Sequence, residues 1–84
     1  MYTFFLSPKS KKFLDKMPRD LRKRIDNALI LLRDGKFREA RVTKLVGSDL
    51  LRKRVGDYRI IFEIDNKKNA LVIFRIGNRK DVYK

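Results

Sequence analysis

Hydrophobic and polar positions in the first half of the chain predict one strand followed by two helices. Residues 2–6 are aromatic or aliphatic apart from one threonine, which favours a strand. Ser7 and Pro8 indicate a helix start, because a serine hydroxyl can cap the first turn and proline suits the first helical position. Pro18 ends this short helix and begins a second one, and Gly35 is expected to cap its far end. The apolar stripe of the second helix consists of Leu21, Ile25, Leu29 and Leu32.

The second half of the chain has the composition of β-structure. The predicted strands cover residues 50–55, 58–65 and 70–76, while residues 36–49 carry a weak signal. The first two strands are joined by the tight turn Gly56-Asp57, and Gly77 is expected to end the last strand. Turns this short cannot hold crossovers, so the strands are expected to be antiparallel. We therefore expect a single α+β domain over residues 1–84: an N-terminal strand, a two-helix hairpin, then an antiparallel β-meander with both helices packed on one sheet face.

Alternation along the predicted strands places several arginines on the sheet face that the helices do not cover. Successive side chains of a strand point to opposite faces. The apolar set of the middle strand that suits the core is Tyr58, Ile60, Phe62 and Ile64. Arg59 therefore points away from the core, and Arg52 and Arg54 share one face of the preceding strand. Arg79 follows the last strand and can reach the same region. Like charges gathered on one face repel, so they favour binding of an anion such as phosphate.

Other side chains in this half of the chain leave alternatives open. Phe74 and Tyr83 are the two aromatic residues considered for stacking on a base. Phe74 is expected in the core instead, whereas Tyr83 is available either to stack on a base or to pack against the domain. Lys53 falls on the core face by its position in the strand, where a charge is costly, so its amino group is expected to reach an edge. The competing interpretation of the arginines is a solvated surface, with Asp57 and Glu63 as salt-bridge partners.

Composition narrows the classes of function. The net charge is +13, from 23 lysines and arginines against 10 acidic residues, so a polyanionic partner is expected. Nucleic acid is the first candidate, an acidic protein the second and a lipid surface the third. The chain has no cysteine or histidine, which excludes disulfides, thiolate metal sites and imidazole catalysis. It also has no apolar run near the ~20 residues of a membrane span, and its first residues read as a strand rather than a signal peptide, so the cytoplasm is the expected compartment.

The segments LLRKRVGDYRIIFEID and RIGNRKDVYK resemble the RelE/ParE toxin superfamily, and within it the RelE-type mRNA interferases. The shared pattern is a basic strand, a glycine-containing turn, a Tyr-Arg strand, then an arginine and a tyrosine near the end. The resemblance spans nearly the whole chain, and residues 44–83 are its specific part. It implies ribosome-dependent cleavage of mRNA in the A site. The 2'-hydroxyl attacks the adjacent phosphate and leaves a 2',3'-cyclic phosphate and a 5'-hydroxyl, without a metal or other cofactor.

The resemblance also assigns roles and partners. Arg52 and Arg59 would hold the phosphates and stabilise the charge of the pentacoordinate state. Arg54 takes the place of a catalytic lysine, Arg79 would lie by the leaving oxygen, and Tyr83 would stack on or orient a nucleotide. Further candidates for RNA contacts are Lys44, Lys53 and Lys80. The implied partners are a cognate RelB-like antitoxin, in a toxin–antitoxin heterotetramer, and mRNA on the ribosome.

Three departures from the family pattern keep other functions open. Asn78 stands where relatives often have histidine, Leu51 where they often have an aromatic residue, and Arg54 where they have lysine. Arginine stays protonated, so it is a poor general base, and Glu63 can act as one only if it faces the site. The general base is therefore unassigned. A ParE-like poison of DNA gyrase and a non-catalytic RNA- or ribosome-binding module of the same fold remain as alternatives.

Overall fold

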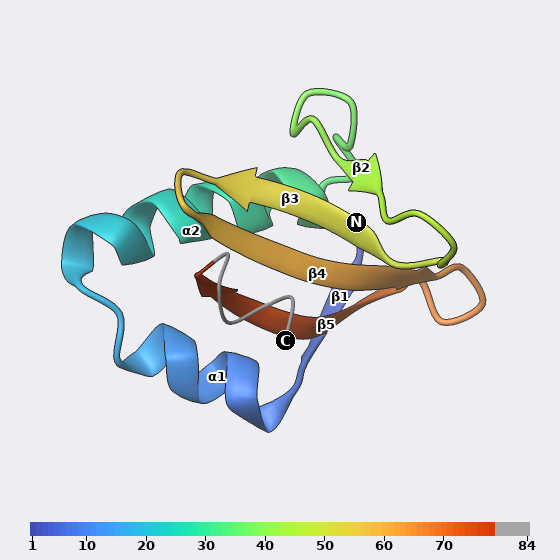
Figure 1. Ribbon diagram of the computed structural model, residues 1–84. Coiled ribbons are helices and arrows are strands. Elements are labelled where there is room, and N and C mark those ends of the chain that lie inside the picture. The colour runs from blue at the N-terminus through green and yellow to red at the C-terminus, as the bar shows by residue number, and fades with distance from the viewer. Residues whose placement is uncertain (79–84) are drawn as a thin grey trace.

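The chain forms one sheet with two helices on one side of it. The structure, a computed structural model, describes residues 1–78. In chain order, its elements are β1 (Thr3–Leu6), α1 (Pro8–Asp15), α2 (Arg19–Arg33), β2 (Thr43–Lys44), β3 (Leu51–Val55), β4 (Tyr58–Asp65) and β5 (Ala70–Asn78). In Figure 1, α2 runs behind β3 and α1 lies below β5. Within residues 1–78, no helix has the length and apolar character that a membrane crossing requires.

The helices begin and end where their sequence predicts. Ser7 caps α1, because its hydroxyl accepts a hydrogen bond from the backbone N–H of Ser10 at 3.2 Å, and Pro8 occupies the first turn. Pro18 is the N-cap residue of α2. Gly35 follows the end of α2 with a φ of 74°, the left-handed conformation that glycine adopts at low cost. The predicted two-helix hairpin is therefore confirmed.

The sheet has the strand order β1-β5-β4-β3-β2. Strands β3, β4 and β5 form the predicted antiparallel meander, and β2 adds a two-residue strand that pairs with Leu51 and Arg52. The β3–β4 hairpin has a two-residue loop, and Gly56 takes a φ of 60° at its first position. Strand β1 lies beside β5 and runs parallel to it, from Thr3 opposite Ala70 to Leu6 opposite Ile73. The first and last strands of the described chain are therefore neighbours.

The core lies between the helices and one face of the sheet. Ile25, Ala28, Leu29 and Leu32 from α2 join Leu14 from α1 and the inward side chains of β4 and β5 in one buried cluster. The predicted inward set of β4 is confirmed, since Ile60 and Phe62 are fully buried in this cluster and Tyr58 and Ile64 pack against it. The helices consequently cover only one sheet face, as predicted.

Strand β5 departs from the prediction in two ways. It continues through Gly77 to Asn78, where the sequence had suggested an end at Gly77. It also contains a bulge, because Ile61 pairs with Arg75 whereas the next residue, Phe62, pairs with Ile73. The extra residue of the bulge is Phe74. The expectation that Phe74 belongs to the core is therefore wrong: its side chain is 44% exposed.

Candidate RNA-binding face

Two rows of paired residues bring four arginines together on the sheet face opposite the helices. Directly paired residues of an antiparallel sheet point to the same face. One row joins Arg54, Arg59 and Gly77 across strands β3, β4 and β5, and the next joins Thr43, Arg52, Ile61 and Arg75. We call this surface the arginine face; its cations are Arg52, Arg54, Arg59 and Arg75. The structure thus places the three predicted arginines of β3 and β4 on one surface, as the alternation of the strands indicated.

Arg59 lies at the centre of this surface and is buried. Only 4% of the residue is exposed. Its Nη1 group donates hydrogen bonds to the backbone carbonyls of Gly56, at 3.3 Å, and Tyr58, at 3.1 Å. Its Nε–H is buried without an acceptor, the one such side-chain nitrogen or oxygen within residues 1–78. A buried cation with an unused donor is costly unless an anion completes its coordination.

Arg54, Arg59 and Arg75 form no ion pair with a carboxylate of residues 1–78. In the part of the chain that the structure describes, the ion pairs are Arg22–Asp26, Arg33–Asp34 and Lys44–Asp49, and none includes Arg54, Arg59 or Arg75. Glu63 faces the same side of the sheet, opposite Val72, but lies four residues along β4 from Arg59, or roughly 13 Å. Among the described residues, the positive charge of these three arginines is therefore left uncompensated by carboxylates.

Two of the lysines proposed to contact RNA, Lys44 and Lys53, lie on the other face of the sheet. Lys53 pairs with the core residue Ile60 and so points to the helix side, away from the arginine face. Burial lowers the pKa of the Lys53 amino group, and the nearby positive charge of Arg41 lowers it further. Lys44 also has the parity of the helix side, and its Nζ lies 3.9 Å from an oxygen of the exposed Asp49. Lys44 and Lys53 therefore share a sheet face with the helices and not with the arginines. For Lys53 this is the face predicted from its position in the strand, and contact of either lysine with RNA stays a prediction.

Part of the predicted site falls beyond the last strand. Arg79, Lys80 and Tyr83 lie outside the described residues. Asn78, the last residue described, pairs with Tyr58 on the helix side of the sheet and is half-buried. Within residues 1–78, no group of three acidic side chains is close enough to hold a metal ion.

The sequence reasoning missed Arg75 and assigned Phe74 to the core, and the bulge is the reason for both. Strict alternation from Ile73 would turn Arg75 inward, whereas the extra residue brings both Phe74 and Arg75 to the face of Ile61. The available signal was the spacing of the apolar residues, since Ile73 and Ile76 are both buried although they are three positions apart. Two inward residues at an odd separation in one strand require a bulge between them.

A shallow cleft of the described surface adjoins the arginines, whereas a larger hollow does not. The cleft, of about 340 Å³, runs between α2 and β3 and is lined by Arg24, Asn27, Lys53, Arg54 and apolar residues. The larger hollow, about 470 Å³, is formed by residues 44–49 of the loop before β3. We give this loop hollow no role in the site, because it contains none of the arginines and only loop side chains line it.

Comparison with known proteins identifies relatives of the whole domain. A family described as "ParE toxin of type II toxin-antitoxin system, parDE" matches residues 4–83. No curated protein matches the sequence. Among solved structures, a chain of the RelE-RelB complex from Pyrococcus horikoshii OT3 is 27% identical, with a TM-score of 0.73 and coverage of 96% of this chain and 98% of that one.

One bacterial and one archaeal structure show the same fold at lower sequence identity to this chain. A chain of the intact Escherichia coli RelBE toxin-antitoxin complex has a TM-score of 0.80 at 18% identity, covering 93% of this chain and 96% of its own. A chain of the RelB-RelE complex from Methanococcus jannaschii has a TM-score of 0.75 at 24% identity, with 95% of both chains covered. The sheet, both helices and their order are therefore shared across nearly the full length of these chains.

Proposed function

Because the chain belongs to the RelE/ParE superfamily of type II toxin–antitoxin toxins, we propose that it is a ribosome-dependent endoribonuclease that cleaves mRNA in the A site. The observation that carries this proposal is the buried Arg59, whose Nε–H has no acceptor and which lies between the other cations of the arginine face. A phosphate diester supplies the anionic oxygens that such a group lacks.

The reaction proposed for this face is an internal transfer. The 2'-oxygen of one ribose bonds to the adjacent phosphorus as the proton of its hydroxyl leaves. The bond from phosphorus to the 5'-oxygen of the next nucleotide breaks, and this 5'-oxygen takes up a proton. The products are a 2',3'-cyclic phosphate and a 5'-hydroxyl. Arg52 and Arg59 hold the phosphate oxygens and stabilise the extra negative charge of the pentacoordinate state. Arg54 adds charge but does not accept the proton, because its guanidinium stays protonated.

The proton acceptor is not assigned to a side chain. Glu63 faces the arginine face, but its distance along β4 from Arg59 is too great for it to serve a phosphate held there. Catalysis then depends on charge stabilisation and on the alignment that the ribosome imposes on the mRNA. From the family resemblance, Arg79 stabilises the leaving oxygen and Tyr83 orients a nucleotide.

The proposed partner in the cell is an antitoxin. The matched chains come from RelB–RelE complexes, and a net charge of +13 suits an acidic partner as well as RNA. We therefore propose a cognate RelB-like antitoxin, a toxin–antitoxin heterotetramer, and action in the cytoplasm, where translating ribosomes are found.

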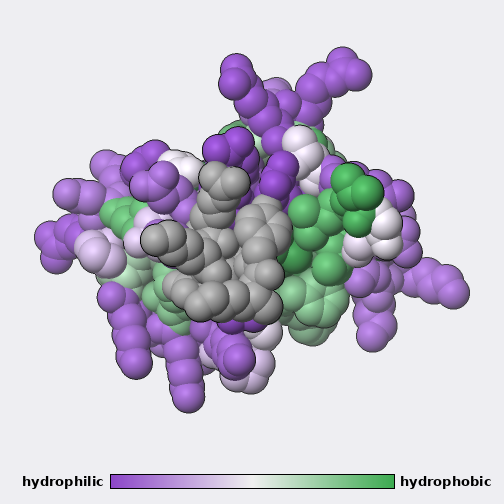
Figure 2. Space-filling model, viewed as in Figure 1, coloured by the Kyte–Doolittle hydropathy of each residue, from purple (hydrophilic) through white to green (hydrophobic). Residues whose placement is uncertain are grey.

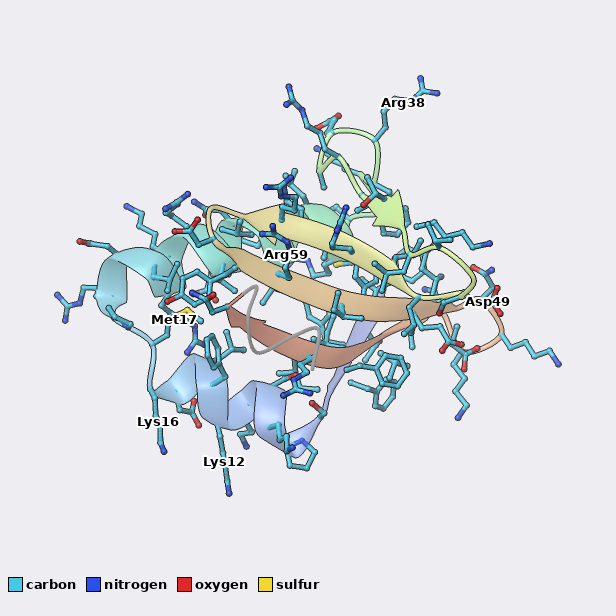
Figure 3. All side chains as sticks on the ribbon, viewed as in Figure 1. Lys12, Lys16, Met17, Arg38, Asp49 and Arg59 are labelled. Carbon is cyan, nitrogen blue, oxygen red and sulfur yellow. The ribbon has the colours of Figure 1, made fainter. Side chains whose placement is uncertain are left out.

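The proposal is tested by adding the purified protein to ribosomes that carry a defined mRNA with an occupied P site, then mapping 5' ends by primer extension. Wild-type protein is expected to give discrete A-site cuts, and Arg59→Met is expected to remove them. Lys12→Met, which removes one positive charge from an exposed position of α1 (Figure 3), is the matched control and should cut normally. Uncut mRNA with the wild-type protein bound to ribosomes would instead indicate the non-catalytic binding module.

A ParE-like poison of DNA gyrase is the second candidate, because the matching family is described by the ParE name. Such a protein would damage DNA in cells while mRNA stays intact. The arginine face favours the first candidate, since gyrase poisoning does not require an RNA-cleaving site. Inducing the toxin and measuring DNA breaks and mRNA ends in the same cells separates the two functions.

A further inference from the structure

We propose that Phe74 and Phe5 form a nucleobase-stacking site beside the arginine face. The inference rests on the proposed function in one respect, since it takes RNA as the polymer whose phosphates the arginines bind. It adds a place for a base next to those phosphates. The site lies where β1 and β5 run side by side, at the edge of the sheet away from β2.

Both phenylalanines are exposed although they belong to the sheet. Phe5 is 52% exposed and Phe74 is 44% exposed, and neither packs against the core cluster. No ring contact joins either side chain to another aromatic residue of the described chain. Figure 2 shows hydrophobic side chains gathered at the region of β1 and β5, to the right of the grey atoms. Exposed rings cost free energy in water, so their faces are available to a planar ligand.

The backbone holds the two rings on the same side of the sheet as the arginines. Phe5 pairs with Val72, which points away from the core, and the bulge turns Phe74 to that side as well. Ser7 makes two hydrogen bonds to the bulge. Its hydroxyl donates to the carbonyl of Phe74 at 2.9 Å, and its N–H donates to the carbonyl of Ile73 at 3.0 Å. The position of Phe74 is thus fixed by the cap of α1 rather than by packing of its ring.

The order of residues along β5 fits a nucleic-acid strand that crosses the face. Arg75 follows Phe74 directly, and the row of Arg54 and Arg59 lies two residues further along, or roughly 7 Å. A backbone phosphate held by Arg75 places the attached base within reach of Phe74. Glu63 borders the rings in the row of Val72, so phosphate is repelled there, whereas a base amino group can donate to its carboxylate. Cations followed by exposed rings are the arrangement that single-stranded nucleic acid binds.

A tryptophan introduced at this site can report on base stacking. Its indole fluorescence has no background from other tryptophans, because the chain contains none. In Phe74→Trp the indole is expected to lose fluorescence when a short single-stranded RNA binds, since a base stacks on it. Ile30→Trp is the matched control, because Ile30 is 45% exposed on α2, away from the arginine face. Its fluorescence should not respond to RNA. Equal responses from both variants, or none from Phe74→Trp while RNA is bound, would overturn the proposal.

Affinity gives a second and independent test on the full-length protein without ribosomes. Phe74→Ala is expected to weaken RNA binding by roughly 5- to 150-fold, the range for loss of one stacked base. The dependence of affinity on salt should stay as in wild type, whereas Arg75→Ala should lower that dependence by about one ion. Unchanged RNA affinity together with weaker antitoxin binding would assign the rings to the protein partner instead and refute the base site.

Failure of this inference and failure of the proposed function give different results. If RNA quenches the fluorescence of Phe74→Trp but ribosome-bound mRNA stays uncut, the base-stacking site is supported and the nuclease function is refuted. If mRNA is cut by Phe74→Ala as efficiently as by wild type, and the oligonucleotide affinity is unchanged, the nuclease assignment holds and the base site is absent.

Discussion

Arg54 and Arg59 lie directly opposite each other across the β3–β4 hairpin, so two positive side chains share one row of the arginine face. Like charges at such a position destabilise a sheet. The pair lies next to the hairpin turn, where the buried guanidinium of Arg59 also donates a hydrogen bond to the carbonyl of Gly56. The arrangement disfavours the free protein and favours a complex with an anion.

The Arg54–Arg59 pair predicts that stability and activity change in opposite directions. Arg54→Gln is expected to raise the free energy of unfolding by about 0.2–1 kcal/mol, because it removes the repulsion across the hairpin. The same variant should cleave ribosome-bound mRNA more slowly. Urea unfolding at low and high salt measures the first effect, which should shrink as salt screens the charges. A variant that is less stable than wild type at low salt would show that Arg54 stabilises the hairpin more than its charge destabilises it.

Arg59 predicts that a small anion stabilises the protein. Inorganic phosphate is expected to raise the Tm, since a ligand at ten times its Kd adds about 1.4 kcal/mol to the folded state. Arg59→Met should remove most of this shift. Arg33→Met is the matched control, because Arg33 lies on α2 and pairs with Asp34 at 3.3 Å. If phosphate stabilises Arg59→Met as much as wild type, the buried guanidinium is not the anion site.

Replacing Lys53 by a neutral residue is expected to raise the free energy of unfolding, and the size of this increase should depend on pH. Its pKa is lowered in the folded state by burial and by Arg41, relative to the ordinary value of 10.5. Below the folded pKa both states bind the proton, so the folded state carries the full cost of the charge. Between the folded pKa and 10.5 the unfolded state binds more protons, so stability rises with pH and the cost disappears. Lys53→Met should therefore be more stable than wild type at pH ~7, and this gain should fade as pH passes the unfolded pKa.

Chemical unfolding between neutral and strongly alkaline pH measures this change. Lys12→Met, at an exposed position of α1, is the control for general loss of positive charge. The explanation fails if both lysine variants gain the same stability, or if the gain of Lys53→Met grows as the pH rises.

Replacing Ser7 is expected to lower the free energy of unfolding by more than the loss of an ordinary helix cap does. Its hydroxyl serves both the N–H of Ser10 and the carbonyl of Phe74, so Ser7→Ala loses a cap and a bond to the bulge. We expect a loss of about 2 kcal/mol, the upper end for N-cap substitutions. Ser48→Ala, which also removes a hydroxyl bonded to a backbone N–H, should cost less because Ser48 lies in the loop before β3. Similar losses from both variants would argue against the double role of Ser7.

The sequence predicted most of the fold because each element has its own local signal. Ser7 with Pro8 marks one helix, Pro18 and Gly35 bound the other, and Gly56 sets the hairpin that brings Arg54 and Arg59 together. The order of the antiparallel strands follows from turns too short to hold a crossover. These features depend on neighbours in the chain, and the sequence displays them directly.

The bulge and the place of β1 could not be predicted in the same way. The inward side of β5 changes at Phe74 because of contacts with Ser7, which is 67 residues away. The parallel pairing of Phe5 with Val72 likewise depends on packing of the finished sheet rather than on a turn. Arg75 was missed because the alternation of side chains changes side at the bulge. The position of Lys53 on the core side was predicted correctly, because β3 has no such break.

The pairing of β1 with β5 also has a consequence for how the protein is made. Thr3 finds its partner Ala70 only after 67 further residues have been added, so β1 is made before the other strands of this sheet and is among the last to be paired. Contacts this distant in sequence slow folding, because the long intervening chain has to be closed first. A growing chain therefore cannot complete its sheet until β5 has emerged. A newly made molecule would therefore acquire its finished sheet, and the arginine face on it, only after β5 has been synthesised.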